Sequence, residues 1–154
     1  MPAVRVFIDT NLLFYIRDVR DQKKSSAAVG WLRALAPTAQ GRTNLQVLNE
    51  LTNALLRQRQ DLTANEVFAL VDEVAFLGAE PIETHIVDLA REMRRRYRYS
   101  WWDTLLLASA LELGCTHFLS EDLNDGQIVT DGPARALTIV DPFAHSPQHL
   151  LSPR

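Results

Sequence analysis

Short apolar runs alternate with longer helical patterns along this chain, and that alternation is what most constrains its fold. Buried strands are predicted at three such runs, VRVFI (4–8), THFLS (116–120) and ALTIVD (136–141). The apolar spacing between them predicts helices over 11–18, 24–36, 44–60, 64–78, 84–98 and 101–114. Because parallel strands need such crossover connections, we expect an α/β fold: a three-layer α/β/α sandwich around a central parallel sheet of about five strands.

Two further strands are expected where the pattern is less regular. One is AEPIE (79–83), ending near Pro81 or Ile82, and the other is AQGRTN (39–44), which is poorly apolar and should be short or irregular. Capping boxes predict two helix starts, one from Thr43 with Gln46 and one from Thr63 with Glu66.

The 154 residues are 47% hydrophobic and 23% charged, as in ordinary globular proteins. We expect one domain over 1–143 and a loosely held tail over 144–154. No apolar run approaches the roughly 18 residues of a membrane span, and no signal-peptide pattern opens the chain, so we expect a cytoplasmic protein without membrane association. The single Cys115 has apolar neighbours and is expected to be a buried structural thiol.

Charge is sorted by region. The net charge of −3 argues against a globally basic nucleic-acid binder, but Arg91 to Arg98 carries five arginines against one glutamate. Phosphate-binding glycine loops and the HExxH zinc motif are absent from the sequence, which excludes hydrolysis of the P-loop kind and gives no reason to expect a zinc site.

Several acids occur where strands end or helices begin. Asp9 follows the first strand, Asp122 lies in SEDLNDG after another, and Asp103 opens the helix over 101–114. Glu50 lies at the edge of the apolar stripe of its helix. Each acid also has an ordinary explanation. These are a helix cap for Asp9, a surface position for Glu50, a capping box of Ser100 with Asp103, and turn chemistry for the stretch around Asp122.

Considered together, the four acids predict a shared site at one edge of the sheet. Parallel topology brings Asp9 and Asp122 to one edge of the sheet, with the start of the Asp103 helix nearby. Like charges at 4 Å cost on the order of 4 kcal/mol per pair at an effective dielectric near 20, so such a cluster must protonate or hold cations. Oxygen ligands without thiolates select a hard ion, Mg²⁺ or Mn²⁺, and such ions support hydrolysis of a nucleic-acid backbone.

The segment RRRYRYSWW (94–102), immediately before Asp103, fits a nucleic-acid substrate. Arginines neutralise phosphates and aromatic rings stack on unpaired bases. We expect RNA contact from at least one of its four arginines, Arg94, Arg95, Arg96 and Arg98. The alternative is that the arginines complement the helix dipole while the aromatic residues belong to the core.

Four motifs, FIDTN, LNEL, WWDTLLLASAL and LSEDLNDGQ, resemble in order and spacing the acidic motifs of PIN-domain ribonucleases. The likeness is greatest to the VapC-type toxins of toxin-antitoxin pairs and extends from about Val4 to Phe143. The resemblance implies a Mg²⁺- or Mn²⁺-dependent endoribonuclease that cuts RNA. It further implies a small antitoxin partner and a homodimer.

By the same resemblance, four acids would hold the metal: Asp9, Glu50, Asp103 and Asp122. Asn11 and Ser120 match polar positions that would orient the carboxylates and water, and Thr10 would cap or pack. Glu121 and Asp125 are further candidates for the last acid, and Asp122 is favoured because it lies two residues after Ser120.

Other functions remain open at the level of sequence. An aspartate at a strand end can be the nucleophile of a haloacid-dehalogenase-like phosphatase, but the DxD arrangement would require an acid where Asn11 stands. A non-toxin PIN nuclease of RNA processing would carry the same motifs. A non-catalytic RNA- or protein-binding module would be expected to lack one of the four acids.

Overall fold

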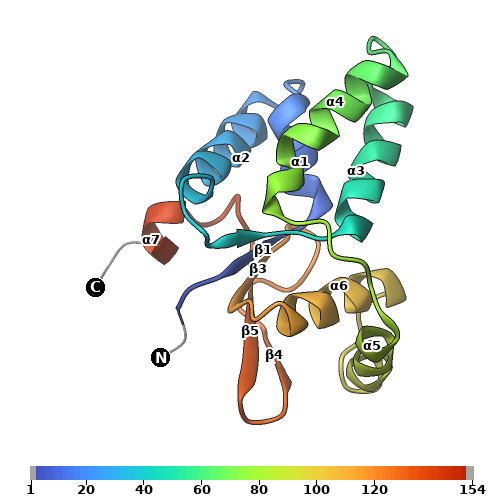
Figure 1. Ribbon diagram of the computed structural model, residues 1–154. Coiled ribbons are helices and arrows are strands. Elements are labelled where there is room, and N and C mark those ends of the chain that lie inside the picture. Colours follow the sequence, from blue (N-terminus) through green and yellow to red (C-terminus); the bar gives the residue numbers. More distant parts are fainter. Residues whose placement is uncertain (1–2, 152–154) are drawn as a thin grey trace.

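The computed structural model describes residues 3–151, which form one five-stranded sheet in the order β2-β1-β3-β5-β4 (Figure 1). The strands are β1 (Val6–Ile8), β2 (Gly41–Arg42), β3 (His117–Leu119), β4 (Ile128–Asp131) and β5 (Arg135–Val140). Four of them run parallel, and the edge strand β4 is antiparallel to β5. The predicted α/β class and strand number are confirmed, whereas the antiparallel edge was not foreseen.

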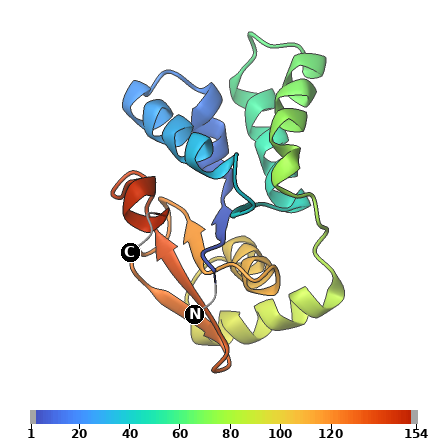
Figure 2. The ribbon, with the colours of Figure 1, turned by 60° about the vertical axis from the view of Figure 1, so that its left-hand side comes forward.

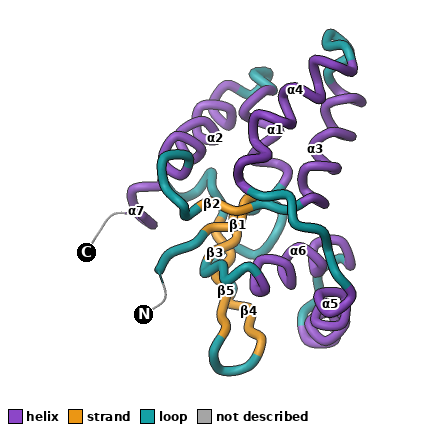
Figure 3. Tube along the Cα trace, in the orientation of Figure 1, coloured by secondary structure: helices purple, strands orange, loops and turns teal. Residues whose placement is uncertain are grey.

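Helices cover both faces of the sheet. Figures 1 and 2 show α1 to α4 on one side and α5 and α6 on the other, and the tube in Figure 3 shows the three layers. The helices are α1 (Thr10–Arg17), α2 (Gln22–Leu35), α3 (Leu45–Gln58), α4 (Ala64–Val74), the 3-10 helix η1 (Ala75–Leu77), α5 (Thr84–Arg96), α6 (Trp101–Glu112) and α7 (Pro147–Leu151). Within residues 3–151, no helix is both long and apolar enough to cross a membrane.

The two predicted helix starts have different outcomes. Thr63 and Glu66 form the expected capping box at the start of α4. The cap of α3 was predicted wrongly, because Asn44, not Thr43, accepts the amide hydrogen bond from Val47 at 3.0 Å. Thr43 is buried, and its hydroxyl donates to the carbonyl oxygen of Ile8 at 3.1 Å. Its side chain therefore ties α3 to the end of β1.

The fifth strand was also predicted in the wrong place. Residues 79–83 form no strand; the carbonyl of Glu80 accepts a hydrogen bond from the Leu45 amide, and Pro81 has no amide hydrogen to give a sheet. The fifth strand is β4, which pairs with β5. The second strand is short, as expected, with two residues in β2.

At the C-terminal end, helix α7 occupies part of the segment for which the sequence predicted a loose tail. Pro147 is buried, and α7 packs beside α2. Residues 152–154 lie outside the described part of the chain.

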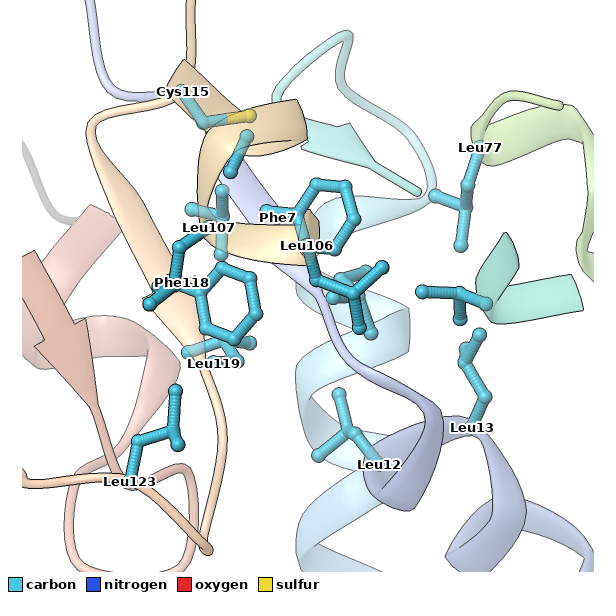
Figure 4. Packing of buried hydrophobic residues seen from close by; sticks show 14 of the residues in the cluster. Phe7, Leu12, Leu13, Leu77, Leu106, Leu107, Cys115, Phe118, Leu119 and Leu123 are labelled. Carbon is cyan, nitrogen blue, oxygen red and sulfur yellow. The ribbon is translucent and has the colours of Figure 1, made fainter. Parts of the chain in front are cut away.

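The core is centred on β1, β3 and α6 (Figure 4). Phe7 and Phe118 occupy paired positions on the two strands, and their rings stack with centroids 5.1 Å apart. The middle of α6 is buried all round, which its nearly unbroken apolar sequence explains. Cys115 is a buried free thiol, and its burial raises its pKa to about 12.

Replacing Phe118 with alanine should destabilise the protein by about 3–5 kcal/mol, because the ring is fully buried against Phe7. Urea unfolding followed by circular dichroism measures the loss. The control is Phe76→Ala, since Phe76 is 61% exposed and should change stability by no more than about 0.5 kcal/mol. Equal effects of the two substitutions would contradict this description of the core.

Candidate functional site

The direction of the chain connections reverses between β1 and β3. After β1 the chain continues to β2 on one side of β1 in the sheet, and after β3 it continues to β4 and then β5 on the other side. The residues that follow the two strands lie side by side, since the Asp9 amide donates to the Leu119 carbonyl at 3.3 Å. Ser120, next along, donates its amide to the Val140 carbonyl at 3.0 Å. Ligands in open α/β sheets bind at such a reversal, outside the carboxyl ends of the strands.

Asp9 lies at this reversal and is almost fully buried, with 7% of its surface exposed. It is the N-cap of α1, and its Oδ1 accepts the Thr10 amide at 2.7 Å. The pKa of Asp9 is raised to about 7, mainly by burial and also by the charges of Asp103 and Glu50, against the hydrogen bonds from Thr10 and Ser120. A buried carboxyl in this state is stabilised either by a proton or by a cation.

Glu50 projects from α3 and is held at both oxygens. The Thr10 hydroxyl donates to Oε2 at 2.8 Å, and the Gln46 side-chain amide donates to Oε1 at 2.9 Å. Thr10 thus contacts two of the predicted acids, which is more than capping or packing. Gln46 was not predicted for the site; its position one helical turn before Glu50 was the available signal.

Asp103 lies in the first turn of α6, where its amide donates to the Ser100 hydroxyl at 3.1 Å. The predicted helix cap is therefore present. Burial raises the pKa of Asp103, and so do the negative charges of Asp122 and Glu50. Figure 1 shows that α3, which carries Glu50, and α6 lie on opposite sides of the sheet. The two helices thus bring carboxylates toward Asp9 from both layers.

Asp122 follows β3 and accepts a hydrogen bond from the Asn11 side chain. Its own amide donates to the Ser120 hydroxyl at 3.2 Å. The two polar residues predicted to orient the acids therefore contact Asp122 directly. Asp9, Glu50, Asp103 and Asp122 thus form a set linked by their charges and by the side chains of Thr10, Asn11 and Ser120.

The other two acids of the last motif have partners elsewhere. Glu121 pairs with Lys24 of α2 at 2.6 Å. Asp125 accepts the Asp141 amide at 2.9 Å and contacts His145 at 2.8 Å. The structure therefore directs Glu121 and Asp125 toward partners outside the set, while Asp122 faces Asn11.

The predicted RNA-contacting arginines divide into two pairs. Arg95 forms an ion pair with Glu92, and Arg96 donates to the Thr130 carbonyl at 2.9 Å. Arg94 and Arg98 are exposed and make no hydrogen bond or ion pair within residues 3–151. Trp102, next to Asp103, is 59% exposed and so is not core.

The donor set suits a hard divalent cation, because every candidate ligand is a carboxylate, hydroxyl or amide oxygen. In the described part of the chain, no three acidic, histidine or cysteine side chains converge into a closed cation cage. Mg²⁺ does not need one, since it keeps several water ligands and binds proteins through one or two carboxylates. The buried Asp9, unfavourable as a bare anion, is the strongest sign of a cation here.

A family model, described as "PIN domain", matches residues 6–126. The chain belongs to the PIN-domain family. The match spans both strand ends described above and all four predicted acids. A comparison with curated proteins gives no match.

Solved structures share the fold of this PIN domain at low sequence identity. One is Mycobacterium tuberculosis VapC20, titled a sarcin-ricin loop cleaving toxin, with a TM-score of 0.57 and 18% identity over 73% of this chain and 86% of that one. A toxin-antitoxin complex from Klebsiella pneumoniae has a TM-score of 0.61 and 16% sequence identity, with 89% of this chain and 97% of that chain covered. FitAcB from Neisseria gonorrhoeae has a TM-score of 0.61 and 13% sequence identity, with 91% of this chain and 99% of that chain covered.

Asp9→Asn should stabilise the metal-free protein at pH 8. The Asp9 carboxyl has a pKa of about 7 when folded and near 3.8 when unfolded. Between those values the folded state binds a proton that the unfolded state lacks, so stability falls as pH rises from about 4 to 7 and stays lower above. The neutral amide removes that penalty, on the order of 2–4 kcal/mol, and keeps the helix cap.

Thermal unfolding in EDTA at pH 8 and pH 5 measures this effect, and the gain should be larger at pH 8. Asp88→Asn, at an exposed position of α5, is the control and should change stability little at either pH. A loss of stability in Asp9→Asn at pH 8 would contradict the electrostatic description of the site.

Proposed function

We propose that this PIN domain is a Mg²⁺- or Mn²⁺-dependent endoribonuclease that hydrolyses RNA phosphodiester bonds with water, and that it is the toxin of a toxin-antitoxin pair. The observation that carries the proposal is the buried Asp9, whose pKa is raised by burial and by the charges of Asp103 and Glu50. A set of acids in this state is suited to bind a cation and the phosphate that accompanies it.

In this proposal Asp9, Glu50, Asp103 and Asp122 hold the metal. The bound ion would supply a water of lowered pKa and stabilise negative charge on the phosphate oxygens. Thr10, through its contacts with Asp9 and Glu50, fixes the distance between α3 and the end of β1. Asn11 and Ser120 orient Asp122.

One of the carboxylates accepts the proton of the attacking water. Since water and not the ribose 2′-hydroxyl attacks, the products carry a 5′-phosphate and a 3′-hydroxyl. This chemistry distinguishes the proposed enzyme from metal-free ribonucleases that form cyclic phosphates.

RNA would approach over the end of α5 and the start of α6. Arg94 and Arg98 have no partner within residues 3–151 and can neutralise phosphates. The exposed Trp102 offers a ring for base stacking next to Asp103. In the sequence these residues lie shortly before Asp103.

A protein partner and the place of action follow from the same proposal. The similar structures include a toxin and a toxin-antitoxin complex, which supports a small antitoxin partner for this chain. We assign it to the cytoplasm, where its RNA substrate is found, and to a homodimer. An antitoxin would act by covering the acids of the site.

Replacing Asp103 with asparagine should reduce RNA cleavage by roughly 10²–10³-fold while leaving the fold intact, because the isosteric amide keeps the Ser100 cap but removes a charge from the site. Cleavage of a labelled RNA with Mn²⁺ present, analysed for 5′-phosphate ends, measures this. Wild-type cleavage should stop in EDTA. Cleavage that persists both in EDTA and in Asp103→Asn would contradict the proposed metal-dependent nuclease.

A double substitution, Arg94→Ala with Arg98→Ala, should raise the KM for RNA several-fold at unchanged kcat and lower the slope of log affinity against log salt by about one to two. Arg33→Ala, at an exposed position of α2, is the matched control with the same charge change per residue. Identical salt slopes for the double variant and wild type would remove these arginines from the RNA interface.

A further inference from the structure

Glu50 and Asp103 lie on helices and Asp9 lies directly between β1 and α1, whereas Asp122 lies on a longer loop. The Asp122 loop, residues 120–126, forms most of the connection between β3 and β4. Its Asp122 faces the negative charge of Asp103. Repulsion between the two carboxylates therefore destabilises this position of the loop when no cation is bound. Contacts of the loop with the rest of the protein must offset that repulsion.

Several contacts hold the loop to the elements around it. The amides of Ser120 and Gly126, at its two ends, donate to carbonyl oxygens of β5. Between them, Asn11 of α1 donates to Asp122, and Asp125 accepts the amide of Asp141 and contacts His145. An ion pair joins Glu121 to Lys24 of α2. It is the contact between unlike full charges nearest to Asp122, because Glu121 is the preceding residue.

Lys24 is unusually well placed for a lysine near the surface. Its ammonium group lies 5.1 Å from the centre of the Tyr15 ring and 5.2 Å from that of Phe143. These two rings pack edge to face, with centroids 5.5 Å apart. Only 34% of the Lys24 side chain and 18% of the Glu121 side chain are exposed. An ion pair this sheltered is screened less than a surface pair and is held in one geometry.

Helix α1 joins this arrangement to the site. Asn11 and Tyr15 are one helical turn apart on the same face of α1, so one contacts Asp122 while the other lies against Lys24. Glu121 and Asp122 are thus held by neighbouring positions on the same side of the protein. Movement of Glu121 would carry Asp122 with it.

We propose that Lys24 is a positioning residue, which holds Glu121 between α1 and α2 and thereby keeps Asp122 at the acid cluster against the repulsion of Asp103. This inference rests on the proposed function for its consequence, since Asp122 matters there as a metal-holding group. Lys24 touches neither the metal nor the RNA in this scheme and acts only through Glu121.

The test variant is Lys24→Met, which keeps an apolar side chain of similar length beside the two rings and removes the cation. Lys24→Arg retains a cation that can pair with Glu121 and stack on the rings, so it should behave like wild type. Lys23→Met is the matched control, because Lys23 is the exposed neighbour in the same helix. Glu121→Gln breaks the same ion pair from the loop side.

Two measurements are made on the full chain, neither of which uses RNA. Amide hydrogen exchange at 121–126 should become roughly tenfold faster in Lys24→Met and in Glu121→Gln, while exchange in α3 stays unchanged. The Mn²⁺ concentration for half-saturation, followed by electron paramagnetic resonance, should rise roughly tenfold in both. Combining Lys24→Met with Glu121→Gln in one protein should change the exchange rate and the Mn²⁺ affinity little beyond the effect of either substitution alone. Lys24→Arg and Lys23→Met should match wild type.

Wild-type exchange at 121–126 in Lys24→Met would overturn the inference. Weaker Mn²⁺ binding with unchanged exchange would also overturn it, because Lys24 would then act by charge and not by position. If Lys24→Met does not fold, Glu121→Gln decides by the same measurements. A wild-type protein that binds Mn²⁺ but cuts no RNA would contradict the proposed function. The exchange and Mn²⁺ measurements would still test the positioning role of Lys24, because neither depends on RNA cleavage.

Discussion

The parallel pairing of β1 with β3 is the interaction on which the rest of this structure depends. It sets Phe7 opposite Phe118 and Ile8 opposite Leu119, in the best-buried part of the core. Because the register is fixed there, the next residues, Asp9 and Ser120, must emerge together at the edge of the sheet. Core packing therefore determines the position of the candidate site, and α3 and α6 add Glu50 and Asp103 from the two helical layers.

This arrangement has an energetic cost that a purely structural protein would avoid. Asp9 is buried beside other acids, and its charged form is unfavourable without a cation or proton. The surroundings oppose the cost with hydrogen bonds, since the Thr10 amide and the Ser120 hydroxyl both stabilise the Asp9 carboxylate. Lys24 supplies a positive charge that pairs with Glu121, the residue before Asp122. A cation bound at these acids would stabilise the folded protein.

The features that follow from local patterns could be predicted from the sequence. Alternating runs gave the α/β class, the Thr63 capping box appeared as expected, and the acids that follow β1 and β3 were placed at the same edge of the sheet. Partners distant in sequence could not be predicted, because no local pattern encodes them: Thr10 with Glu50, Thr43 with Ile8, and Lys24 with Glu121 are examples. The antiparallel β4 was missed because its sequence, IVTD, is short and mixed.

Anomalous diffraction from crystals of the wild-type protein grown with Mn²⁺ would show whether these acids hold a metal. We expect a strong manganese peak bordered by the carboxylates of Asp9 and Asp103, and loss of that peak in crystals of Asp9→Asn. Manganese found only elsewhere on the molecule, or a peak at this site that persists undiminished in Asp9→Asn, would contradict the claim that the buried acid at the end of β1 anchors a metal centre.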